Sequence, residues 1–201
     1  MIDAILKDFP DSFETERLLL RCPRPGDGPE ISRAVNETLD SLRPWMPWAQ
    51  EPASARTSEL TARRAHVRFL EREDLMLLLF LKGTDTMVGA SGLHRIDWSV
   101  PKFEIGYWCR QRFQGLGYIS EAVRGITTFA FDTLGAERVE IHMDTRNVAS
   151  RRVAEGVGYH LEGTLHSQGR DVQGELRDTL VYALTPEDYR QLAGGRAWRG
   201  R

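Results

Sequence analysis

The chain has little cysteine, no long apolar run and no marked excess of charge of either sign. Its 201 residues include only Cys22 and Cys109, far apart and in no Cys-x-x-Cys spacing. This usage excludes a disulfide framework, gives no sign of a zinc site and is typical of a reducing compartment. We therefore expect a cytoplasmic protein that holds no metal.

Charge and hydropathy exclude two further classes of partner. There are 27 Lys and Arg against 29 Asp and Glu, a formal net charge of -2. Nonspecific nucleic-acid binding needs a basic excess, which this chain lacks. The longest apolar run, residues 75–81, is far shorter than the roughly 20 residues of a membrane span. The N-terminus also lacks the residue order of a signal peptide, so we expect neither nucleic acid nor membrane as a partner.

Composition and length favour one globular domain, residues 1–193, followed by a disordered tail at 194–201. Short apolar or alternating runs predict strands, and apolar residues three or four apart predict helices. The expected strands are 16–21, 75–81, 87–93, 103–109, 138–143, 159–165 and 176–184. The expected helices are one that opens near Pro29 with Asp27 as its cap, then 57–73, 122–134, 150–155 and 186–192. In helix 57–73 we expect the buried face to carry Leu60, Ala65, Val67 and Leu70.

A glycine-containing turn lies between the expected strand 103–109 and the expected helix 122–134. It reads RQRFQGLGYISEA from Arg110. Gly115 and Gly117 allow a tight turn, and the helix that follows adds unpaired amides and the positive end of its dipole. This arrangement suits a phosphate or pyrophosphate, although a tight turn with no ligand has the same pattern. Ser120 stands where a Rossmann motif needs its third glycine, and no Gly-Lys-Ser/Thr of a P-loop is present.

Several short motifs carry a family resemblance when they are taken in order. They are ETERLLLR, LRPWMPW, EIGYW, QGLGYISEA, NVAS and LEGTL, within residues 14–189. This series resembles the GNAT acetyltransferases, and among them the RimJ/RimL branch of protein N-terminal acetyltransferases. The resemblance implies an α+β fold, a three-layer sandwich whose central, mixed and twisted sheet is flanked by helices. It also implies acetyl-CoA as the donor and direct attack by an amine on its thioester.

The family's pyrophosphate motif, Q/R-x-x-G-x-G/A, fits this chain in two registers. One begins at Arg112 and matches every letter, whereas the other begins at Gln114 and meets Ile119 at its last position. We prefer the second because it places GYISEA at the helix start. The resemblance then implies these coenzyme-binding residues: Arg112, Gln114, Gly115, Leu116, Gly117, Tyr118, Ile119, Ser120 and Asn147.

Two catalytic candidates follow from the resemblance. Many relatives carry a tyrosine acid at the position of Ala154, where this chain has none. Ser150 of NVAS is therefore the candidate residue that hydrogen-bonds the leaving thiol. Its alternative role is a helix N-cap. Glu104 is the first candidate base. A structural carboxylate at Glu104, a histidine base at His94 or His142, or an amine that arrives neutral are the alternatives.

The acceptor is less defined by the sequence than the donor. Trp45, Trp48 and His94 are the candidate substrate-binding residues, although tryptophans beside prolines also pack over cores. We expect a protein N-terminus, such as that of a ribosomal protein, as the acceptor. A small amine (a polyamine, an aminoglycoside or an amino acid) and a noncatalytic acyl-CoA-binding module are the alternatives. A homodimer is possible, as in many relatives.

Overall fold

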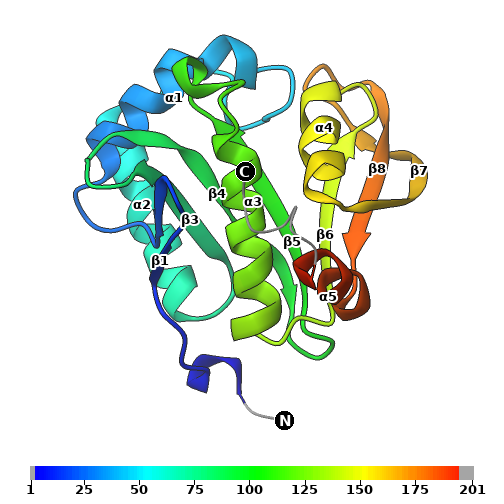
Figure 1. Ribbon diagram of the computed structural model, residues 1–201. Helices are drawn as coiled ribbons and strands as arrows, with labels where there is room; N and C mark the ends of the chain where they lie inside the picture. Colours follow the sequence, from blue (N-terminus) through cyan, green and yellow to red (C-terminus); the bar gives the residue numbers. More distant parts are fainter. Residues whose placement is uncertain (1–2, 195–201) are drawn as a thin grey trace.

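A computed structural model describes residues 3–194, which form one mixed sheet flanked by helices (Figure 1). The sheet order is β1-β2-β3-β4-β5-β6-β8-β7. The strands are β1 (Ser12–Glu14), β2 (Leu18–Arg21), β3 (Leu75–Leu81), β4 (Met87–Asp97), β5 (Lys102–Cys109), β6 (Arg138–Asp144), β7 (His160–Arg170) and β8 (Leu176–Leu184). The helices are α1 (Gly28–Leu42), α2 (Ala55–Leu70), α3 (Tyr118–Thr128), α4 (Val148–Val157) and α5 (Pro186–Gly194). Short helical segments lie at Ala4–Leu6, Gln111–Phe113 and, as a π-helix, Phe129–Thr133.

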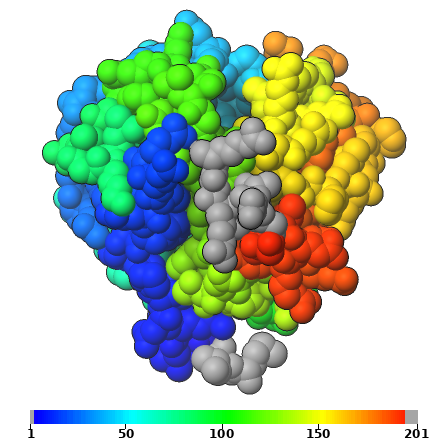
Figure 2. All heavy atoms as spheres, in the orientation of Figure 1, coloured from blue at the N-terminus to red at the C-terminus, as the bar shows by residue number. Residues whose placement is uncertain are grey.

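Two hydrophobic clusters fix the layers. The larger one packs α3 and α4 against one face of the sheet, with Ile126 and Ala154 among its buried residues. The smaller one packs α1 and α2 against the opposite face, through Ala34 and Ala62. The molecule is therefore the expected α+β sandwich of three layers. In Figure 2 the N-terminal strands, in blue, and the α4–β7 end, in yellow, lie on opposite sides of α3, in green.

The central pair of strands separates along its length. β5 and β6 run parallel and pair only at Lys102–Arg138, Phe103–Val139 and Glu104–Glu140. Beyond that point β5 stays paired with β4 as far as Cys109, and β6 stays paired with β8 as far as Asp144. The other neighbouring strands of the described sheet are antiparallel. A V-shaped gap consequently opens in the middle of the sheet after Glu104.

The buried face of α2 differs from the predicted one. Leu60, Val67 and Leu70 are 45%, 51% and 53% exposed, so the prediction was wrong for these three. Ala65 is buried as predicted, and the other buried positions are Ser58, Ala62 and Phe69. Small residues on that face allow a close approach to α1. The carboxylate of Glu59 also accepts hydrogen bonds from the backbone amides of Gly26 and Gly28, which fixes the rotation of the helix.

Other elements match the sequence with smaller corrections. Strands 75–81 and 176–184 have the predicted bounds, whereas β1 was missed. Asp27 precedes α1 as predicted, but its carboxylate accepts two hydrogen bonds from Arg21 and does not cap the helix. Gly194 ends α5, and the rest of the predicted disordered tail, 195–201, lies outside the described residues. Among the described residues, no helix is both long enough and apolar enough to cross a bilayer.

Candidate active site

A cleft of about 1160 Å³ lies where β5 and β6 separate. A pocket for one drug-sized ligand usually measures about 300–1,000 Å³, so this cleft lies just above the upper end of that range. Its walls come from both strands, the turn before α3, the first turns of α4 and the loop after α1, with contributions from β7 and β8. The gap in the sheet makes the cleft, because side chains there have no neighbouring strand to pack on.

The two sides of the cleft belong to opposite faces of the sheet. Side chains alternate along a strand, so Ile105 and Tyr107 of β5 share the α3–α4 face with Met143 of β6. Glu104 of β5 and His142 of β6 are on the other face, toward α1 and α2. Groups that approach the gap from opposite faces of the sheet therefore meet inside it.

The turn before α3 presents backbone amides to the cleft. Gly115 and Gly117 have φ of 73° and 80°, the left-handed conformation that glycine adopts without strain. Gly117 is the N-cap of α3, and its carbonyl accepts the first helical hydrogen bond, from the Glu121 amide. The backbone amides of residues 118–120 have no acceptor within the helix. The side chain of Ile119 is buried in the core, so it points away and leaves its own amide open.

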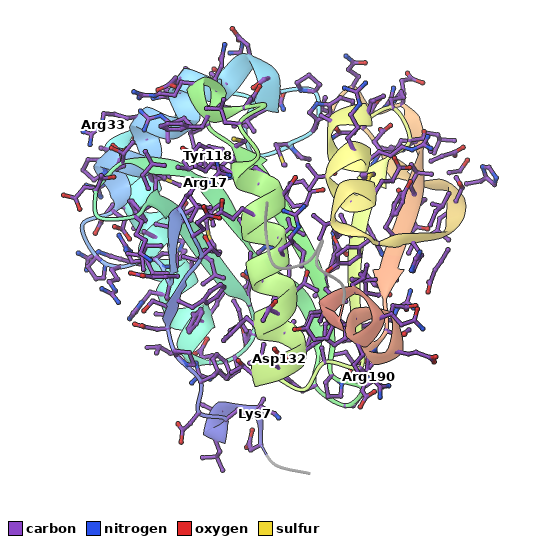
Figure 3. All side chains as sticks on the ribbon, in the orientation of Figure 1. Lys7, Arg17, Arg33, Tyr118, Asp132 and Arg190 are labelled. Atoms are coloured by element: carbon purple, nitrogen blue, oxygen red, sulfur yellow. The ribbon has the colours of Figure 1, made fainter. Side chains whose placement is uncertain are left out.

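Arg17 holds this turn from outside. Its guanidinium donates to the carbonyl of Leu116 and to the carboxylate of Glu121, at 3.1 and 2.6 Å. It also lies over the ring of Tyr118, 4.3 Å from the centroid, as the neighbouring labels in Figure 3 show. Burial alone would raise the pKa of Glu121, but hydrogen bonds from Thr15 and Arg17 lower the pKa below its ordinary value. The turn is thus tied to β2 by a charged network.

A second ion network ties the same segment to α1. Arg110 is 4% exposed and donates to Glu30 at 2.8 Å and to Glu37 at 2.7 Å. Arg112 also pairs with Glu37, at 2.6 Å. Burial would raise the pKa of Glu37, but the hydrogen bonds from Arg112 and Arg110 lower it. Neither arginine lines the cleft, so the structure engages Arg112 with α1 and not with the proposed phosphate site.

Most of the remaining predicted coenzyme-binding residues line the cleft, and Leu116 does not. Gln114 lines the cleft, and its amide donates to the Ser41 hydroxyl and to the Cys109 carbonyl, at 3.3 Å each. Leu116 is 54% exposed and lies outside the lining. The other lining residues from the predicted set are Gly115, Gly117, Tyr118, Ile119, Ser120 and Asn147.

Ser150 lies in the first turn of α4 but does not cap it. Asn147 is the N-cap, and its side-chain oxygen accepts from the Ser150 amide at 3.0 Å. The alternative role of Ser150 as N-cap was therefore wrong. The Ser150 hydroxyl is instead 2.9 Å from the hydroxyl of Tyr107, a contact across 43 residues. Burial raises the pKa of Tyr107 to about 12. Tyr107 belongs to the EIGYW motif, from which no role for its side chain was predicted.

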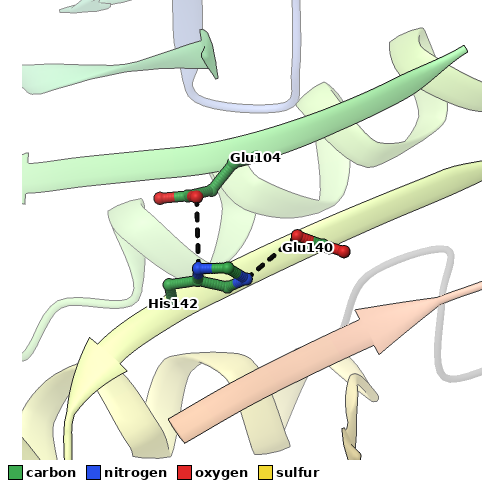
Figure 4. A group of neighbouring side chains, drawn as sticks. All are labelled: Glu104, Glu140 and His142. Carbon is green, nitrogen blue, oxygen red and sulfur yellow. Dashed lines mark ion pairs between the residues drawn. The ribbon is translucent and has the colours of Figure 1, made fainter. Parts of the chain in front are cut away.

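Glu104, Glu140 and His142 form a cluster at the point where the strands separate (Figure 4). Glu104 is 9% exposed and pairs with Arg95, and one of its oxygens is 3.3 Å from His142 Nδ1. His142 Nε2 is 2.9 Å from a Glu140 oxygen but makes no hydrogen bond there. The structure therefore brings together two of the candidate bases, Glu104 and His142.

The three predicted acceptor residues are not brought together. Trp45 lines the cleft and is 36% exposed. Trp48 is 55% exposed and lies outside the lining, with its ring 6.3 Å from that of Trp108. His94 is one strand away from the gap. Its Nδ1 is 2.9 Å from Asp74, and its ring packs over Gly106.

These features define a class of protein. Parallel strands that separate around a cleft, with open amides on one side and ionisable side chains on the other, suit transfer between a phosphate-bearing donor and a second substrate. A sequence profile described as "Acetyltransferase (GNAT) domain" matches residues 17–160. The chain belongs to the GNAT family of N-acetyltransferases and is an acyltransferase.

Similar proteins support this assignment. YdaF of Bacillus subtilis (strain 168), named provisionally as a ribosomal N-acetyltransferase, is 30% identical over 87% of this chain and 94% of its own. The acetyltransferase MccE, solved with acetyl-CoA and AMP, has a TM-score of 0.80 at 21% identity and covers 88% of this chain and 97% of its own. RimL, a ribosomal L7/L12 α-N-protein acetyltransferase solved with coenzyme A, has a TM-score of 0.79 at 22% identity. The match covers 87% of this chain and 97% of the RimL chain.

Proposed function

We propose that this protein moves the acetyl group of acetyl-CoA to the α-amino group of a protein N-terminus in the cytoplasm. The observation that carries the proposal is the gap between β5 and β6, with different chemistry on its two faces. We call the α3–α4 face with its amide turn the donor side. The face that carries Glu104, His142 and Trp45 is the acceptor side. The name of YdaF, a relative at 30% identity, supports the choice of acceptor.

The donor side fits the chemistry of coenzyme A. The amides of residues 117–120 suit its pyrophosphate, with Gln114 and Gly115 beside them. Asn147 uses its side-chain oxygen to cap α4, and its side-chain nitrogen makes no hydrogen bond within the described residues, so it is available to a pantetheine amide. Bound acetyl-CoA supplies a thioester whose carbonyl carbon is open to attack by an amine.

The acceptor side carries groups that can remove a proton from the attacking amine. A C–N bond forms, the C–S bond of the thioester breaks, and the attacking amine loses a proton. Imidazole titrates near neutral pH, which suits a general base. Glu104 and His142, which meet at Nδ1, take this proton as a pair because His142 Nε2 is buried beside Glu140. Arg95 balances the Glu104 charge. Across the gap, the hydroxyl of Ser150 donates to the leaving sulfur.

The charges on the acceptor side disfavour a polycation. A polyamine or an aminoglycoside needs unpaired carboxylates, but the lining carboxylates already have arginine partners. Glu104 pairs with Arg95, and Glu140 pairs with Arg138. Asp144 and Asp171 share Arg146. An open cleft walled by Trp45 suits a peptide with one terminal amine. A homodimer of this chain stays a prediction.

The test measures acetyl transfer to matched acceptors. A peptide with a free N-terminus, the same peptide with a blocked N-terminus and an internal lysine, and a polyamine are each incubated with acetyl-CoA. Release of free thiol gives the rate, and mass spectrometry locates the acetyl group. We expect acetylation of the free α-amine alone. Preferred transfer to the polyamine, or to the lysine of the blocked peptide, would overturn the acceptor assignment.

A further inference from the structure

Tyr107 and Ser150 form a hydrogen-bonded polar pair on the donor side of the cleft. Tyr107 comes from β5 and Ser150 from α4, and both line the cleft. The Tyr107 hydroxyl is 2.9 Å from the Ser150 hydroxyl and 3.1 Å from the Ser150 carbonyl. Ala154, one turn further along the same face of α4, is fully buried and has no polar side-chain atom. Among the described residues, Tyr107 supplies the one side-chain partner of the Ser150 hydroxyl.

The pair has two hydrogen-bonded arrangements because Tyr107 has a single proton. When Tyr107 donates to the Ser150 carbonyl, it accepts from the Ser150 hydroxyl, whose proton is then engaged with the Tyr107 oxygen. When Tyr107 donates to the Ser150 hydroxyl oxygen, the serine proton is free to point elsewhere. The backbone of Ser150 is held by the hydrogen bond that its N–H donates to the side-chain oxygen of Asn147, so only hydroxyl protons need to move.

We propose that Tyr107 is the positioning residue that orients the Ser150 hydroxyl as a donor to the leaving thiolate. This inference rests on the proposed function. As the C–S bond breaks and its electron pair passes to sulfur, the Ser150 proton turns toward the sulfur. Tyr107 then donates to the Ser150 oxygen and polarises its O–H bond, as expected for a chain of hydrogen bonds in a low dielectric.

The pair stabilises the thiolate by hydrogen bonds and does not give up a proton. An ordinary thiol has a pKa near 8.5. Burial raises the pKa of Tyr107 to about 12, so its hydroxyl is the weaker acid and keeps its proton. The thiolate therefore leaves as an anion and takes its proton later from solvent.

The test compares Tyr107→Phe, Ser150→Ala and the double variant in steady-state acetyl transfer to a free N-terminal peptide. We expect Tyr107→Phe to lower kcat about 10-fold, with little change in the KM for acetyl-CoA. Ser150→Ala should lower kcat about 100-fold, and the double variant should be no slower than Ser150→Ala alone, because the two residues act as a unit.

Tyr159→Phe is the matched control. Tyr159 is more deeply buried than Tyr107, and its hydroxyl is 2.7 Å from that of Thr127, outside the cleft lining. Tyr159→Phe should lower the melting temperature at least as much as Tyr107→Phe does and leave kcat unchanged. Two outcomes would overturn this inference and leave the proposed function standing. In the first, Tyr107→Phe keeps the wild-type kcat while Ser150→Ala is impaired. In the second, the losses of the two single variants multiply in the double variant. Full activity in Ser150→Ala would remove both residues from the reaction, and no transfer by the wild type would overturn the proposed function.

Discussion

The donor side of the cleft is made largely of backbone, whereas the acceptor side is made of side chains paired across strands. Open amides at 117–120, shaped by two glycines with positive φ, form the donor side. Glu104, Glu140 and His142 form the acceptor side, and each depends on a neighbour for its orientation. Changes in the amide turn of the donor side should therefore alter binding, and changes among the ionisable side chains of the acceptor side should alter the chemical step.

The largest effect should come from His142→Ala. Loss of a general base typically costs 10²–10⁴-fold, so we expect kcat to fall about 100-fold or more, with the Kd for acetyl-CoA unchanged. His160→Ala is the control, since His160 is exposed on β7 and pairs loosely with Asp188, at 3.8 Å. Steady-state rates check both variants. Wild-type kcat in His142→Ala would show that the amine loses its proton elsewhere.

Gly117→Ala should weaken the binding of acetyl-CoA and leave kcat nearly unchanged. A side chain at φ of 80° disfavours this turn conformation by about 1–2 kcal/mol, so we expect the turn to relax in the free protein. Binding must then restore the conformation, which raises the KM for acetyl-CoA by up to roughly 10-fold.

Gly83→Ala introduces the same strain at φ of 75° in the turn between β3 and β4, outside the cleft lining. If both variants changed the KM equally, global destabilisation would be the cause and the turn would have no special role.

A smaller effect is expected from Glu37→Gln. It removes the carboxylate shared by Arg110 and Arg112 but leaves Arg110 its bond to Glu30, so we expect a loss of about 1–3 kcal/mol in the free energy of unfolding. The KM for acetyl-CoA should rise a few-fold, because the segment before the turn is less well held. Denaturant unfolding and kinetics measure the two effects. Asp40→Asn, at an exposed ion pair on the same helix, should change neither.

The smallest effect concerns the pH dependence of stability. Hydrogen bonds from Thr15 and Arg17 hold the pKa of Glu121 below its ordinary value of 4.5, against the opposing effect of burial. The stabilisation is therefore fully present above pH 4.5 and is lost as the pH falls through the folded-state pKa. Glu121→Gln should flatten the decline in unfolding free energy over that acidic range. An unchanged decline would assign the acid sensitivity to other carboxylates.

The same contrast explains what could be predicted from the sequence. The strands other than β1, the glycine turn and the helix after it depend on local patterns, and they were found with errors of a few residues in their bounds. The three-residue β1 carries too short a pattern and was missed. The pairs Tyr107–Ser150 and Arg110–Glu37 join residues 43 and 73 positions apart, and no local pattern marks them. The buried face of α2 was wrong because Glu59 and small residues set its rotation, not its larger apolar side chains.

Calorimetric titration with acetyl-CoA tests the division of the cleft most directly. It would compare the wild type, Gly117→Ala and His142→Ala, each shown to be folded. We predict one-to-one binding by the wild type, binding about 10-fold weaker in Gly117→Ala, and wild-type affinity in His142→Ala. Equal weakening in both variants, or no binding by the folded wild type, would contradict separate donor and acceptor sides.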